Sequence, residues 1–121
     1  MKKVILVADD SPTIRKFVSI SLKVNGYEII QVADGMEALE VLPSERIDLV
    51  ITDLNMPNID GFELIKAIRS NEDYREIPII ILSSLSGSEE IEKGIQCGAN
   101  AYLLKPFDSN RILYEVSKFL T

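Results

Sequence analysis

Near its N-terminus the chain reads VILVADDSP over residues 4–12, where a short apolar run is followed by two aspartates. An apolar run this short and continuous is typical of a β-strand that is buried on both faces, as in a parallel sheet. The residues that follow have the features of a helix start, because Ser11 suits an N-cap position and Pro12 suits the first helical position. The stretch therefore predicts a buried strand that ends at two carboxylates and leads directly into a helix.

The same alternation continues along the chain. Further short apolar runs predict strands at residues 28–32, 48–52, 79–82 and 101–104. Segments with helical periodicity separate the strands and predict helices from Pro12 to Asn25-Gly26, over 35–42, from Asp60 through Ile68, around Ile91 and Ile95, and from Ile112 to Leu120. Repeated strand–helix alternation implies a parallel sheet with right-handed crossovers and helices on both faces. We therefore expect an α/β, flavodoxin-like fold, a doubly wound five-stranded parallel sheet of order 2-1-3-4-5 with five helices, forming one domain over residues 1–121.

The composition excludes several classes of function. The 121 residues include no histidine and one cysteine, Cys97. Without histidine, the chain has no Ser-His-Asp or Cys-His catalytic site, none of the usual zinc sites and no role as a phosphohistidine carrier. The single cysteine excludes an internal disulfide. The formal net charge of −6 disfavours direct binding of nucleic acid by this domain.

The distribution of apolar residues bears on membrane association. No apolar stretch approaches the roughly 20 residues that a transmembrane helix needs. The N-terminal apolar run, residues 4–8, is also too short for the apolar region of a signal peptide. We therefore expect no membrane insertion and a cytoplasmic location.

Three carboxylates follow the first and third strands, and the switch point of the expected sheet order lies between these two strands. In a sheet of order 2-1-3-4-5, ligands bind beyond the carboxyl ends of strands 1 and 3. Asp9 and Asp10 follow the first strand, and Asp53 follows the third. Taken separately, the acid pair suits a helix cap and Asp53 suits a turn, but like charges brought together repel unless a cation lies between them. Convergence therefore favours a site for Mg²⁺, which binds one or two carboxylates and keeps several waters.

Two further polar groups follow the fourth and fifth strands at the same edge. The fourth strand ends in Ser83-Ser84 and the fifth in Lys105-Pro106. A lysine at the end of an apolar strand needs a partner, for which the aspartates are candidates, unless its side chain reaches solvent. A hydroxyl, an ammonium group and a metal ion around one carboxylate form a phosphoryl-binding arrangement, with Asp53 as the nucleophile.

Several motifs together resemble the response-regulator receiver domains of bacterial two-component signalling. They are VADDS at 7–11, ITDLNMPNIDG at 51–61, PIIILSS at 78–84, GA at 98–99 and KPF at 105–107. The similarity extends from Lys3 to Phe119, and the motifs occur in the right order at the expected strand ends. Within the family, residues 55–58 and Tyr102 are most similar to the single-domain, CheY-like chemotaxis regulators.

The resemblance implies a role for each acidic position. Asp53 would accept a phosphoryl group from a phosphohistidine on a sensor histidine kinase or a phosphotransfer protein, in a reaction that requires Mg²⁺. The direct metal ligands would be Asp10, Asp53 and the backbone carbonyl of Asn55. Asp9 would act on the metal through water.

The resemblance also implies roles for the other polar positions. Lys105 would pair with the phosphoryl group, and the Lys105–Pro106 peptide bond would be cis. Ser83 would be the switch hydroxyl and Tyr102 the aromatic residue that turns inward on activation. Because Ser84 is a second adjacent hydroxyl, the choice of Ser83 rests on strand register alone.

A receiver domain is expected to catalyse its own phosphorylation and dephosphorylation without acting as a turnover enzyme. Phosphorylation would change the binding of a downstream effector protein at the face made by the fourth helix, the fifth strand and the fifth helix. We expect a monomer, with dimer formation on phosphorylation left open. Whether an output domain follows Thr121 in a longer protein is also left open.

Two other functions share features with the receiver. A phosphatase of the haloacid dehalogenase type also places an aspartate and Mg²⁺ at a strand end, but it needs a second aspartate two residues later, where this chain has Asn55. An interaction module that has lost the chemistry is disfavoured because every expected site position is filled.

Overall fold

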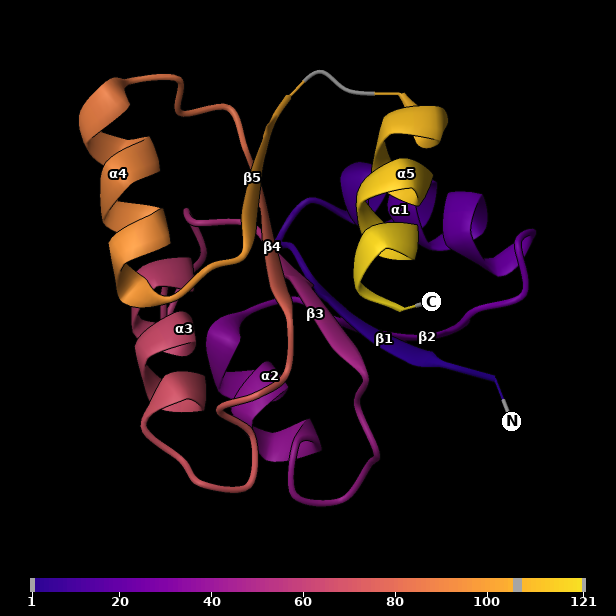
Figure 1. Ribbon diagram of the computed structural model, residues 1–121, viewed down its shortest axis with the longest axis horizontal. Helices are drawn as coiled ribbons and strands as arrows, with labels where there is room; N and C mark the ends of the chain where they lie inside the picture. The colour runs from indigo at the N-terminus through magenta and orange to yellow at the C-terminus, as the bar shows by residue number, and fades with distance from the viewer. Residues whose placement is uncertain (1, 106–107, 121) are drawn as a thin grey trace.

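The computed structural model describes residues 2–105 and 108–120, and it confirms the predicted alternation and sheet order. The elements follow one another as β1 (Val4–Ala8), α1 (Pro12–Lys23), β2 (Glu28–Val32), α2 (Gly35–Val41), β3 (Leu49–Thr52), α3 (Gly61–Arg69), β4 (Ile79–Ser83), α4 (Ser88–Cys97), β5 (Ala101–Leu104) and α5 (Ser109–Phe119). The strands form a parallel five-stranded sheet in the order β2-β1-β3-β4-β5 (Figure 1).

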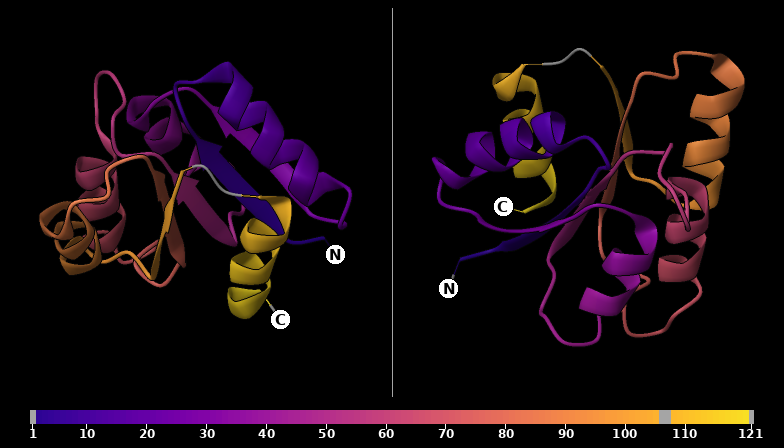
Figure 2. Two further views of the ribbon diagram at one scale, coloured as in Figure 1. Left: turned by 90° about the horizontal axis from the view of Figure 1, so that it is seen from above. Right: turned by 180° about the vertical axis from the view of Figure 1, so that it is seen from behind.

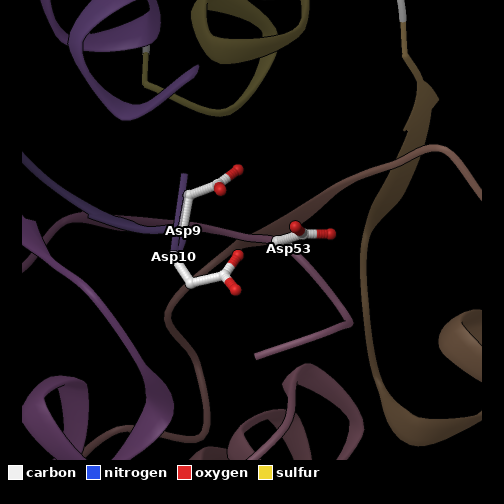
Figure 3. A group of neighbouring side chains, drawn as sticks. All are labelled: Asp9, Asp10 and Asp53. Atoms are coloured by element: carbon white, nitrogen blue, oxygen red, sulfur yellow. The ribbon is translucent and has the colours of Figure 1, made fainter. Parts of the chain in front are cut away.

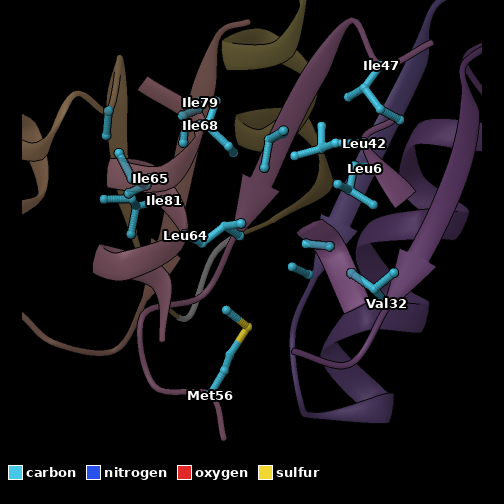
Figure 4. Packing of buried hydrophobic residues seen from close by; sticks show 14 of the residues in the cluster. Leu6, Val32, Leu42, Ile47, Met56, Leu64, Ile65, Ile68, Ile79 and Ile81 are labelled. Carbon is cyan, nitrogen blue, oxygen red and sulfur yellow. The ribbon is translucent and has the colours of Figure 1, made fainter. Parts of the chain in front are cut away.

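The helices cover both faces of this sheet and create two hydrophobic cores. α1 and α5 lie on one face, and α2, α3 and α4 lie on the other (Figures 1 and 2). Because side chains alternate along a strand, Ile5 and Val7 of β1 enter the core beneath α1 and α5. Leu6 and Ala8 enter the opposite core, which Figure 4 shows packed against α3.

The expectation that every strand is buried on both faces is wrong for the two edge strands. The central strands β3 and β4 are buried along their full length, and β1 is buried apart from half-buried Val4. In β2, however, Glu28 and Gln31 are exposed, and in β5 Leu104 is exposed. An edge strand has a neighbour on one side only, so part of it meets solvent. The exposed residues of β2 are polar, whereas the exposed Leu104 of β5 is apolar.

Local capping sets where most helices begin. At the starts of α1, α2, α3 and α5, a backbone N–H of the first turn donates to a side-chain oxygen of the N-cap residue, which is Ser11, Asp34, Asp60 and Asp108 respectively. α1 ends at Lys23, earlier than the predicted Asn25-Gly26. Gly26 instead closes the following turn at φ +93°, a left-handed conformation that glycine adopts without strain. In the part of the chain that the structure describes, no helix is both long and apolar enough to cross a bilayer.

Candidate functional site

The pairing of β1 with β3 brings three carboxylates together. Ala8 lies opposite Thr52 in the sheet, and the backbone N–H of Asp53 donates to the carbonyl of Ala8 at 2.9 Å. The next residues along both strands are therefore neighbours in space. Carboxylate oxygens of Asp9, Asp10 and Asp53 all lie within 4.8 Å of one another, and Figure 3 shows the three side chains gathered beyond the strand ends.

Backbone groups hold two of these carboxylates in place. Asp9 Oδ1 accepts a hydrogen bond of 2.8 Å from the N–H of Ser11, at the entry to α1. Asp53 Oδ1 accepts one of 2.7 Å from the N–H of Leu54. Both aspartates are buried, so these bonds supply part of the stabilisation that water would otherwise give to a carboxylate.

Lys105 lies between the same two carboxylates. Its Nζ is 3.1 Å from Asp9 Oδ2 and 3.2 Å from Asp53 Oδ2. Burial acts to lower the pKa of Lys105, but the combined attraction of Asp53 and Asp9 outweighs burial and leaves that pKa raised. The lysine is therefore a permanent cation at the end of β5, placed against the predicted phosphoryl acceptor.

The pKa of Asp53 is raised, chiefly because burial disfavours its charged form. The positive charge of Lys105 acts to lower this pKa, while the neighbouring carboxylate of Asp9 acts to raise it. One lysine thus does not fully compensate two buried carboxylates. A second positive charge at this point would stabilise the ionised form of Asp53.

The donor set fits a hard divalent cation. Asp10 is exposed and, among the residues that the structure describes, its carboxylate makes no hydrogen bond or ion pair. Its oxygens are therefore available beside those of Asp53, and the site is open to water on that side. Oxygen ligands from one or two carboxylates together with water are what Mg²⁺ selects.

The two predicted switch residues are linked through the backbone of Leu85. Ser83, the last residue of β4, is buried, whereas Ser84 is exposed. The N–H of Leu85 donates to Ser83 Oγ at 3.1 Å, and the hydroxyl of Tyr102 donates to the carbonyl of Leu85 at 2.7 Å. Sequence reasoning missed this link, because it depends on backbone groups that any residue type provides.

The loop after β3 folds back onto Asp53. The N–H of Gly61 donates to the carbonyl of Leu54 at 2.9 Å, and a Cβ on Gly61 would collide with the backbone carbonyl of Asp53. Glycine is therefore required there by close approach. Asn55 lies in this loop and is exposed. Its role as a carbonyl ligand stays a prediction, and the predicted cis bond between Lys105 and Pro106 lies outside the described residues.

Comparison with known sequences found clear similarities along most of the chain. A family model for the response regulator receiver domain matches residues 5–117. The sensor protein EvgS of Escherichia coli is 43% identical over 102 residues, which make up 84% of this chain and 8% of that protein. The chain spans less than half the length of the curated relatives that it matches.

Solved structures agree as well. The chemotaxis response regulator CheY4 of Vibrio cholerae superimposes with a TM-score of 0.92 and 37% identity, covering 98% of this chain and 99% of that one. The receiver domain of the sensor histidine kinase PA1611 from Pseudomonas aeruginosa has a TM-score of 0.91 and 29% identity, covering 99% of this chain and 98% of that one. The PA1611 structure has a magnesium ion coordinated in its active-site cleft.

Proposed function

Because the chain belongs to the response regulator receiver domain family, we propose that residues 1–121 form one receiver domain in which Asp53 accepts a phosphoryl group. The donor is a phosphohistidine on a sensor histidine kinase or a phosphotransfer protein. The observation that carries this proposal is the position of Asp53, which is buried at the end of β3 beside the acid pair and within 3.2 Å of Lys105 Nζ. As a member of this family the chain is a phosphoacceptor domain and not a turnover enzyme.

Four groups would hold the metal in this proposal. Asp10, Asp53 and the backbone carbonyl of Asn55 are the direct ligands, and Asp9 acts through water. Mg²⁺ bound there supplies positive charge to the phosphoryl oxygens and to the clustered carboxylates. The open, oxygen-rich side at Asp10 supports this assignment, as does the magnesium ion in the cleft of the PA1611 receiver domain.

The side chains divide the chemistry between them. The N–H of Leu54 holds Asp53 Oδ1, so Oδ2 is the oxygen that attacks phosphorus. A bond forms between Oδ2 and phosphorus while the bond from phosphorus to the donor imidazole nitrogen breaks, and the imidazole leaves with the electron pair. Lys105 Nζ, already beside Oδ2, then pairs with a phosphoryl oxygen. Attack of water on phosphorus later releases inorganic phosphate and restores the carboxylate.

The phosphoryl group would be sensed by Ser83 and Tyr102. Ser83 Oγ already accepts the N–H of Leu85, which leaves its own proton free to be donated to a phosphoryl oxygen. A shift of Ser83 would move Leu85, whose carbonyl holds the hydroxyl of Tyr102. The population of Tyr102 conformations would change, and with it the effector-binding face formed by α4, β5 and α5.

Incubation with acetyl phosphate tests this function directly. The wild-type protein is expected to gain one phosphoryl group in the presence of Mg²⁺ and almost none after the metal is removed with a chelator. Intact-protein mass spectrometry measures the gain, and peptide mapping locates it. A folded protein that binds Mg²⁺ but takes up no phosphoryl group would contradict the proposal and favour a silent interaction module.

A pair of serine variants tests the switch. Ser83→Ala is expected to remove the response of the Tyr102 ring signals in NMR spectra to phosphorylation, because the phosphoryl group then has no hydroxyl to move. Ser84→Ala is the matched control, since this neighbouring hydroxyl is exposed, and it is expected to respond like the wild type. Equal responses from both variants would show that Ser83 does not transmit the signal.

A further inference from the structure

The loop after β3, residues 54–60, is fastened to the turn between β2 and α2. The side-chain amide of Asn58 donates to Asp34 Oδ2 at 2.7 Å. One residue later in both segments, the N–H of Gly35 donates to the carbonyl of Ile59 at 3.2 Å. Two segments that are distant in sequence are thus joined by adjacent bonds, one from a side chain and one from the backbone.

Asp34 is a rigid anchor for this contact. It is buried, and as the N-cap of α2 its Oδ1 accepts the N–H of Glu37 at 2.9 Å. Hydrogen bonds from Glu37 and then from Asn58 lower the pKa of Asp34, so the carboxylate is ionised at neutral pH. Each carboxylate oxygen of Asp34 therefore has its own donor. Because the bond to Oδ1 holds the carboxylate at the start of α2, the position of Oδ2, which accepts from Asn58, is fixed as well.

The loop approaches this anchor closely. A Cβ on Gly35 would lie 2.5 Å from the carbonyl oxygen of Ile59, so only glycine permits the contact. Asn58 has φ +67° and is the only non-glycine residue with positive φ in the described ranges. Asparagine tolerates this conformation better than most residues. Glycine would tolerate it too, but only asparagine of the two supplies the amide that reaches Asp34.

The same loop carries Asn55. Its first residues are held from the β3 side, since the N–H of Leu54 bonds to Asp53 Oδ1 and the carbonyl of Leu54 accepts the N–H of Gly61. Over the described part of the chain, Asn55 itself forms no hydrogen bond and it is exposed. The position of its carbonyl is thus set by the two ends of the loop, one at Asp53 and the other at Asn58.

We propose that the contact between Asp34 and Asn58 positions the loop so that the carbonyl of Asn55 faces the metal held by Asp10 and Asp53. Asp34 and Asn58 are then positioning residues for a metal that neither of them touches. This inference rests on the proposed function, because it takes Asn55 as a ligand. Without the contact the loop samples more conformations. Metal binding must then also order the loop, and this loss of conformational entropy lowers the affinity for the metal.

Asn58→Gly is the sharpest test, because glycine keeps the positive φ and removes only the amide. The dissociation constant for Mg²⁺, followed through NMR shifts of the site amides, is expected to rise by roughly tenfold, the lower end of the range for residues that support metal ligands. The NMR order parameter of the Asn55 backbone amide is expected to fall as well, because the loop samples more conformations. Neither readout depends on phosphorylation.

Asn71→Gly is the matched control. It makes the same substitution in the turn after α3, where Asn71 Oδ1 accepts the N–H of Asp73 at 2.8 Å. A similar loss of stability is expected there, with unchanged affinity for Mg²⁺. The double variant Asp34→Asn/Asn58→Asp exchanges donor and acceptor at constant charge, and it is expected to recover most of the affinity that Asn58→Gly loses.

The outcomes separate this inference from the proposed function. Absence of Mg²⁺ binding by the wild type would overturn both. Binding by the wild type together with equal affinity in Asn58→Gly would overturn the positioning role alone. If Asn58→Gly does not fold, Asp34→Ser gives the same test, because serine still caps α2 but has no second oxygen to accept from Asn58. An affinity for Mg²⁺ equal to that of the wild type in Asp34→Ser would likewise overturn the positioning role.

Discussion

Asp53→Asn is expected to abolish phosphorylation by acetyl phosphate and, in the absence of metal, to stabilise the fold. The first effect follows because an amide oxygen is not a usable nucleophile toward phosphorus. The second follows because Asp53 is a buried carboxylate beside Asp9, and burial with this like charge raises its pKa despite Lys105. Removing the charge is expected to raise the free energy of unfolding at pH 7 by on the order of 1 kcal/mol.

The dependence on pH has a definite sign. Because the pKa of Asp53 is higher in the folded than in the unfolded protein, the folded state binds its proton more tightly. The charge of Asp53 therefore destabilises the wild type at pH values above the folded pKa. The advantage of Asp53→Asn is expected to be full there and to shrink as the pH falls through the folded pKa toward the unfolded value, below which both states are protonated.

Mg²⁺ is expected to reverse the order of stability. At 100 times its dissociation constant, a ligand that binds only the folded state adds about 2.7 kcal/mol. The variant lacks one of the proposed ligands and gains less. Denaturant unfolding of both proteins, first with a chelator and then with Mg²⁺, measures the free energy of unfolding without the metal and the stabilisation that the metal adds. A variant that is less stable than the wild type in chelator would show that Lys105 compensates the buried charge of Asp53 after all.

Arg69→Met is expected to destabilise the fold strongly, lowering the free energy of unfolding by about 3 kcal/mol. At the end of α3, the guanidinium of Arg69 donates to the carbonyls of Gly98, Arg75 and Ile77 and to Asn100 Oδ1, at 2.6–2.9 Å. Methionine fills similar volume but donates nothing, so the carbonyls of Gly98 and Ile77, whose bonds to Arg69 are partly buried, lose this donor. Urea denaturation measures the loss.

Arg75→Met is the matched control, because it changes charge and shape in the same way at an exposed position. Its effect is expected to stay within about 0.5 kcal/mol. Arg69 joins segments at the end of the sheet away from Asp53, so the folded Arg69→Met protein is expected to be phosphorylated normally under conditions where it is fully folded. Equal stabilities of the two variants would refute the role assigned to Arg69.

Local signals in the sequence determined the order of elements and, through it, the place of the candidate site. Short apolar runs, caps such as Ser11 and Asp60, and helical periodicity act over a few residues, so they can be interpreted without the fold. Strand order then predicted that residues following β1 and β3 would be neighbours. The carboxylates of Asp9, Asp10 and Asp53 do lie together.

Tertiary structure alone decided the contacts that depend on distance between remote segments. Strand register alone could indicate that Ser83 lies in the interior and Ser84 outside, but only the path of the following loop joined Leu85 to Tyr102. Local propensity carries no information about such contacts, because a backbone carbonyl or amide offers the same bond whatever its side chain.

The contact between Asp34 and Asn58 shows the same division. The residue type of Asp34 and its place before Gly35 suit a helix cap, and it is one. Its second carboxylate oxygen finds a partner 24 residues away only because β2 and β3 flank β1 and bring their loops to the same edge. The sequence determined which groups are available at that edge, and the packing of the chain decided which of them meet.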